Sequence, residues 1–152
     1  MNRSVKVFLL WSLISLKISL VCIAQTPKID SLKTLISSTS SETDKIGLYL
    51  SLSRELTRID PENALLYAER AFELAKKNNN QSKIADAKWR IGKIYKTIGK
   101  YDKAEKYLNE ALVYFKEIKE KYKTSQIIID IGDIIKNKGN LDSAMILYLE
   151  AL

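Results

Sequence analysis

The apolar residues between positions 84 and 118 recur at intervals of three or four, the spacing of one face of an α-helix. The pattern breaks at Gly99, a residue type that commonly ends a helix in the left-handed conformation. Two amphipathic helices joined by a tight glycine turn form an antiparallel hairpin. The apolar positions are Ile84, Ala87, Ile91, Tyr95 and Ile98, followed by Ala104, Leu108, Ala111, Leu112, Phe115 and Ile118.

The same pattern returns forty residues later, since residues 91–112 and 131–152 are identical at ten of 22 aligned positions. A less similar copy precedes both, with the second-helix pattern at residues 60–77. A single hairpin cannot bury both of its faces, so repeated hairpins are expected to stack on one another. The small residues kept in the two later copies define the repeat: Gly92, Gly99, Ala104 and Ala111, then Gly132, Gly139, Ala144 and Ala151.

One stretch opposes the helical pattern. Residues 127–135, with the sequence IIIDIGDII, are rich in β-branched side chains and favour a strand by propensity. They align in phase with the predicted helix that ends near Ile98. We therefore predict a helix in this segment as well.

The repeat resembles the tetratricopeptide repeat (TPR) family. That family places a large apolar residue, Gly and Tyr in its first helix, and Tyr, Ala, an aromatic residue and Ala in its second. The resemblance implies an all-α fold, a TPR-type α-solenoid of antiparallel helix hairpins. Because the period is 40 rather than about 34, we expect each helix to be about a turn longer. The matching residues are Ile91, Gly92, Tyr95, Tyr101, Ala104, Leu108 and Ala111, then Ile131, Gly132, Ile135, Leu141, Ala144, Tyr148 and Ala151.

We divide the chain into three parts. Residues 1–24 have a basic start, an apolar stretch and small residues before Gln25, which is the order of a secretory signal peptide. Residues 25–42 are expected to form a short capping helix and a Ser/Thr-rich linker. The TPR array is predicted over residues 43–152, with repeats at about 43–80, 81–120 and 121–152, the last one incomplete.

The first segment therefore predicts export to the periplasm or cell envelope. Lys17 interrupts the apolar stretch, which weakens the case for a membrane-spanning helix, but an uncleaved anchor stays an alternative. Lipid attachment at Cys22 is disfavoured because Val21, and not a small residue, precedes it.

Composition argues against catalysis. The chain contains no histidine and one cysteine, which removes the commonest general base and the usual metal-ligand clusters. We expect no enzyme activity, no cofactor and no metal site in these residues. The net charge is +7, of which residues 1–24 supply +3. No basic stripe accompanies the remainder, so nucleic-acid binding is not expected. Asp130 and Asp133, one helical turn apart, are interpreted as an ordinary exposed acid pair.

Similarity to the TPR family also implies a binding groove lined by the first helices of the repeats. Trp89, flanked by cationic side chains, suits an anchor residue with an acidic neighbour on a bound partner. The alternative is that Trp89 only packs against the next repeat. The clamp of Lys, Asn and Arg residues used by chaperone-tail-binding members is not carried over, because its Asn residues are missing. The predicted groove residues are Arg54, Arg58, Trp89, Arg90, Lys93, Lys96, Asp130, Asp133, Lys136 and Asn137.

Exported TPR segments with this long period resemble the sensor regions of bacterial envelope signalling proteins. The resemblance implies a non-catalytic domain that binds a protein or peptide and forms the N-terminal part of a longer signalling protein. A scaffold for envelope assembly is the alternative. Contact with the membrane is expected only through the N-terminal segment or a following part. The C-terminal residues Leu147, Tyr148, Ala151 and Leu152 predict an uncovered apolar edge, covered by further chain or by a second copy.

Overall fold

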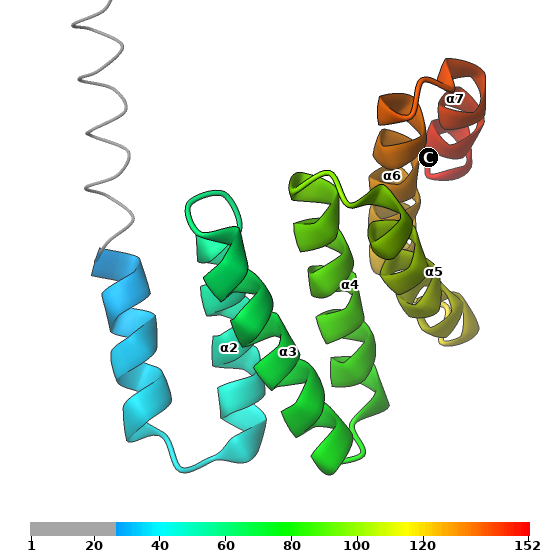
Figure 1. The fold of residues 1–152 in the computed structure, drawn as a ribbon. Coiled ribbons are helices and arrows are strands. Elements are labelled where there is room, and N and C mark those ends of the chain that lie inside the picture. Colours follow the sequence, from blue (N-terminus) through cyan, green and yellow to red (C-terminus); the bar gives the residue numbers. More distant parts are fainter. Residues whose placement is uncertain (1–26) are drawn as a thin grey trace, which may run out of the picture.

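The computed structural model describes residues 27–152, so the predicted signal peptide and Cys22 lie outside the described residues. Seven helices follow one another in this part of the chain and stack side by side as antiparallel hairpins (Figure 1). The predicted all-α solenoid is confirmed. The helices are a first one over residues 27–38, then α2 (Glu42–Leu56), α3 (Pro61–Lys77), α4 (Gln81–Thr97), α5 (Tyr101–Glu117), α6 (Lys121–Asn137) and α7 (Leu141–Glu150).

The four helices α3 to α6 have 17 residues each, and their turns recur every twenty residues. Each turn has one residue with a positive φ angle, at Asn79, Gly99, Lys119 and Gly139. The following amide then donates to a carbonyl five residues back, as Lys100 does to Tyr95. This is the Schellman arrangement, which satisfies carbonyls left free at a helix end. Two of the four turns therefore use a residue other than glycine, which the repeat pattern did not predict.

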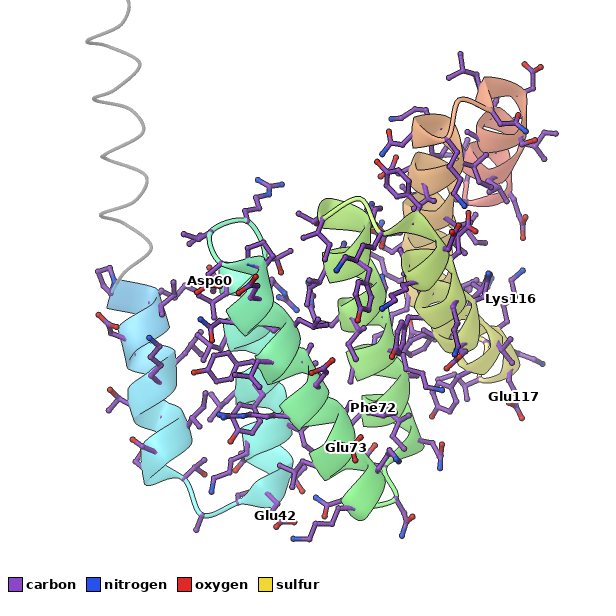
Figure 2. All side chains as sticks on the ribbon, viewed as in Figure 1. Glu42, Asp60, Phe72, Glu73, Lys116 and Glu117 are labelled. Atoms are coloured by element: carbon purple, nitrogen blue, oxygen red, sulfur yellow. The ribbon has the colours of Figure 1, made fainter. Side chains whose placement is uncertain are left out.

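Side-chain caps fix the starts of several helices. The carboxylate of Asp60 accepts a hydrogen bond from the amide of Asn63, and Pro61 occupies the first turn of α3, where a missing N–H costs nothing. Asn80 caps α4 and Asn140 caps α7 in the same way. Asp60 lies at the opposite end of the first hairpin from Glu42, where α2 begins (Figure 2).

The core lies between the hairpins and consists of the periodic apolar residues of the sequence. Leu108, Phe115 and Ile94 are fully buried, and the β-branched segment 127–135 lies within α6 as predicted. The helix over residues 27–38 packs on this core through Ile29, Leu32 and Ile36, and Lys28 of that helix forms a 2.8 Å ion pair with Glu55. The alternation of small and large side chains is what allows successive helices to pack closely.

The apolar surface of α7 differs from the sequence expectation. Leu147 and Tyr148 are half-buried and turn toward the neighbouring helices, whereas the prediction left both uncovered. Ala151 is half-buried as well, and Leu152 is exposed. The exposed edge therefore includes Leu152 as expected, whereas Leu147 packs against the core and Tyr148 donates a hydrogen bond to Asp133 of α6. The exposed apolar residues of this helix and its end are Leu141, Met145, Ile146, Leu149 and Leu152.

Candidate functional site

The first helices of the repeats line the concave side of the solenoid. Among the described helices, α2 contacts α4 and α4 contacts α6, whereas α3, α5 and α7 make no such contacts with one another. The second helices must therefore spread apart on the convex side, and the first helices converge on the concave side. Nine of the ten predicted groove residues lie on α2, α4 and α6. The exception is Arg58, which lies in the turn after α2 because that helix ends at Leu56.

Asp130 is the centre of a polar cluster between α4 and α6. Its side chain accepts a 2.8 Å hydrogen bond from Trp89 Nε1 and a 2.6 Å hydrogen bond from Lys96 Nζ. Lys93 Nζ lies 3.6 Å from the same carboxylate. Asp130 is only 5 % exposed, so the interpretation of this residue as an ordinary surface acid is wrong. A buried carboxylate needs such partners, since an unpaired one would carry a large desolvation cost.

Asp133 extends this cluster toward α7. It accepts hydrogen bonds of 2.9 Å from Lys96 Nζ and 2.8 Å from the Tyr148 hydroxyl. Burial opposes its charged form, but the hydrogen bonds from Lys96 and Tyr148 outweigh burial and lower the pKa of Asp133 below its ordinary value. The expectation of an exposed acid pair is therefore wrong for this residue too. The two carboxylates tie the second repeat to the third.

Trp89 takes part in the same repeat-to-repeat contact. Its indole is half-buried, meets the Phe115 ring edge-on at 6.5 Å between ring centroids, and donates its N–H to Asp130. Lys93 Nζ lies 5.5 Å from the centroid of the indole ring. The hydrogen-bonding capacity of Trp89 is thus used within the chain, because an indole has only this one donor.

A second group of charges joins the beginnings of α4 and α6. Lys123 of α6 donates to Asp86 of α4, and its ammonium lies 4.7 Å from the centroid of the Phe115 ring. Lys83 lies 3.7 Å from the other oxygen of Asp86. The concave acids Asp86, Asp130 and Asp133 all have lysine partners as a result. Sequence reasoning missed Lys123 and Tyr148, since no local pattern signals a contact with a residue so far along the chain.

Arg90 differs from these paired groups. It lies on α4, yet it forms no salt bridge or side-chain hydrogen bond within residues 27–152. Burial and the nearby charge of Arg54 lower the pKa of Arg90 to about 10, and the attraction of Asp130 and Asp86 offsets this only in part. Arg54, in the last turn of α2, is exposed and also has no salt bridge in the described part of the chain.

An open cavity of about 590 Å³ lies between the end of the helix over residues 27–38 and the first part of α2. Gly47 and Ser51 of α2 form part of its wall, and Lys83 of α4 reaches it. Ser51 is one helical turn before Arg54. The wall consists of Leu35, Ser38, Thr39, Thr43, Asp44, Gly47, Leu48, Ser51 and Lys83.

The predicted groove residues therefore separate into groups. Trp89, Lys93, Lys96, Asp130 and Asp133 come together in the cluster between α4 and α6. Arg54 of α2 and Arg90 of α4 form no salt bridge within residues 27–152. The other two lie toward the end of α6. Lys136 is exposed and lies 3.7 Å from Asp133 of the cluster, and Asn137 is the exposed last residue of that helix.

Within residues 27–152, no group of three or more acidic or cysteine side chains is arranged to hold a metal ion. The described helices also include none that is both long and apolar enough to cross a bilayer.

Comparison with known families agrees with this architecture. The family model described as the SusR N-terminal TPR domain matches residues 23–124, about two thirds of the chain. A comparison with curated proteins gave no match. The matched residues cover the helices from 27–38 through α5 and the start of α6, and so include α2 and α4 with Arg54 and Arg90. The stacked hairpins and the matching family model together establish that this chain belongs to the SusR N-terminal TPR domain family.

Proposed function

We propose that these residues bind another protein or peptide on the concave face formed by α2, α4 and α6. They act as the N-terminal sensor or interaction part of a longer signalling protein of the bacterial envelope. The observation that carries the proposal is the match to the SusR N-terminal TPR domain, because TPR domains generally mediate protein binding. Their role is binding and not catalysis, as is typical of a TPR sensor domain.

Contacts between the first helices also support the concave face. Helix α4 contacts both α2 and α6, so these three helices form one continuous surface across the repeats. A ligand at this position touches two or more repeats at once. Binding there is therefore sensitive to how the hairpins stack, which is the property that a sensor needs.

Site-specific photo-crosslinking in cells tests this proposal. A photoreactive amino acid replaces Ser51 on the concave face in one variant and the exposed Asn109 of α5 on the convex face in a control variant. We expect a discrete crosslinked partner from position 51 and none from position 109. Crosslinks that form only at position 109, or equally at both, contradict a concave-face function.

The location in the envelope rests on residues 1–24 and is part of the same proposal. We expect a chain lacking these residues to fold like the full chain and to remain in the cytoplasm, because the signal peptide and the hydrophobic core lie in separate segments. Cell fractionation of the two chains measures this. Equal cytoplasmic retention of both chains contradicts export.

A further inference from the structure

We propose that the outer side of α7 is a self-association surface, on which a second copy of this chain packs its own α7. Four large apolar side chains of this helix are each at least 60 % exposed. Their spacing places them on one side of the helix, turned away from the buried Ala144. Because α7 is a second helix of the solenoid, this surface is separate from the concave face. We call these residues the α7 patch: Leu141, Met145, Ile146 and Leu149.

The repeat register shows that the stacking of hairpins does not cover the middle of this patch. Ile146 and Leu149 occupy the positions that Lys106 and Asn109 have in α5, forty residues earlier. Lys106 and Asn109 are exposed although α6 packs against α5, and their two counterparts in α3 are exposed although α4 packs against α3. A hairpin in the same register would therefore leave Ile146 and Leu149 in water. Their occupant must approach from the convex side.

The size of the α7 patch matches the apolar surface that a stable dimer needs. Each of its four side chains presents on the order of 100 Å² of apolar surface, so two copies together present about 800 Å². A standard interface buries about 1,600 Å² in total, of which a little more than half, about 900 Å², is non-polar. One copy of the patch, at about 400 Å², also lies in the size range of functional apolar patches on soluble proteins.

The two ends of the solenoid differ, which favours pairing of like ends. The exposed residues of the helix over residues 27–38 are mostly polar, and Leu35 is the one large apolar side chain exposed on that helix. Within the described residues, the N-terminal end therefore lacks an apolar surface that matches the α7 patch. Packing of α7 on α7 brings together the same patch from both copies. This is the self-complementary contact of a two-fold symmetric dimer.

Charge argues against a membrane as the occupant of the patch. Helix α7 contains Asp142 and Glu150 and has no lysine or arginine. Helices that lie on a membrane surface usually carry cationic side chains beside their apolar face, because anionic lipids attract them. Asp142 is exposed and repels such lipids, whereas Glu150 lies 3.1 Å from Lys116 of α5. A second copy, with an equally apolar patch, fits better.

Sedimentation velocity of the full chain over a wide range of concentration tests the proposal. We expect a reversible equilibrium between monomer and dimer. The test variant combines Ile146→Lys with Leu149→Asn, which gives α7 the side chains that α5 has at the equivalent positions. This variant should raise the dissociation constant of the dimer at least about tenfold, because polar groups replace apolar contacts at the centre of the interface. A wild-type chain that stays monomeric, or that grows into open-ended assemblies, overturns the proposal.

Leu66→Lys is the matched control, because Leu66 has the position of Ile146 in α3 and is 41 % exposed. We expect its dissociation constant to equal that of the wild-type chain. An equal rise in this control contradicts the assignment to α7. Thermal melting at high dilution should be the same for all three chains, since the substituted side chains are exposed.

Cysteine crosslinking in cells tests the contact without added charge. Leu149→Cys is compared with Asn109→Cys, the equivalent position of α5, each combined with Cys22→Ser because Cys22 is the one cysteine of the chain. With a bismaleimide reagent we expect a crosslinked dimer from position 149 and none from position 109. Equal crosslinking at both positions, or none at 149, contradicts a dimer through α7.

Flotation with vesicles that contain phosphatidylglycerol separates a second copy from a lipid surface. We expect the wild-type chain and the Ile146→Lys, Leu149→Asn variant to float to the same extent, because the patch binds protein. If the wild-type chain floats, the variant does not, and neither forms a dimer, then the patch binds lipid and the proposal is wrong.

Discussion

Gly92 is the position at which the close approach of two helices can be tested most directly. A Cβ atom at this position would lie 2.8 Å from Leu108 Cγ, 2.9 Å from Leu108 Cδ2 and 3.2 Å from the carbonyl oxygen of Ala104. Leu108 is fully buried, so its side chain has no open space into which to move. We therefore expect Gly92→Ala to force α4 and α5 apart.

The size of the effect follows from two opposing contributions. Overpacking a well-filled core costs about 1–3 kcal/mol. The upper end of this range applies here because the backbone oxygen of Ala104 also lies close to the added methyl group. Alanine stabilises a helix interior by about 1 kcal/mol relative to glycine. The net loss in the free energy of unfolding is then about 2 kcal/mol, a fall in melting temperature of about 6 °C for a chain of this size.

Gly47→Ala provides a matched control, because Gly47 is also inside a helix but has no atom within 4 Å of its hypothetical Cβ. We expect this variant to gain about 0.5–1 kcal/mol from helix propensity alone. Thermal and denaturant unfolding followed by circular dichroism measure both variants. In a Leu108→Ala background, Gly92→Ala should cost little, because the clashing side chain is gone. If Gly92→Ala is as stable as Gly47→Ala, the close approach does not fix the helix spacing.

Three further predictions concern the polar cluster and the turns. Asp130→Ala should lower the free energy of unfolding by about 3 kcal/mol, because Lys96 and the Trp89 indole lose a buried partner. Asp133→Ala should lower it by only about 1 kcal/mol. Denaturant unfolding measures both variants, and equal losses contradict the burial argument. The pKa of Asp133 is lowered in the folded chain, so its contribution is present above the unfolded pKa and is lost as pH falls through the folded one. Melting should therefore show stability falling below about pH 4, with a smaller fall in Asp133→Asn. Lys119→Gly should stabilise the chain by about 1 kcal/mol in thermal melting, because Lys119 has a φ angle of 57° at a helix end. An unchanged melting temperature argues against backbone strain at this position.

Much of the fold could be predicted because each repeat has the same spacing of apolar residues and similar turns. The spacing of apolar residues predicts each helix, and Gly99 and Gly139 predict two of the turns, whose φ angles are 74° and 92°. The in-phase copies also override the strand propensity of residues 127–135, which lie in α6. Agreement among propensity, period and turn chemistry is the condition under which a sequence specifies one structure.

The candidate site could be predicted only in part. Family resemblance predicted a groove on the first helices of the repeats, and nine of the ten predicted residues lie on α2, α4 and α6. It did not distinguish residues that face a partner from residues that bind each other. Trp89 and Asp130 are separated by 41 positions, and nothing local to either indicates that an indole N–H meets a carboxylate.

The sequence by itself determined the helices, their period and their stacking order, because these depend on spacing along the chain. Only the tertiary structure decided which charges on the first helices are paired. Lys96 and Arg90 are both cations on α4, yet Lys96 contacts two carboxylates of α6 while Arg90 has no ion pair in the described residues. The physical reason is that pairing depends on the distance between side chains of neighbouring repeats, which the packing of α4 against α2 and α6 fixes.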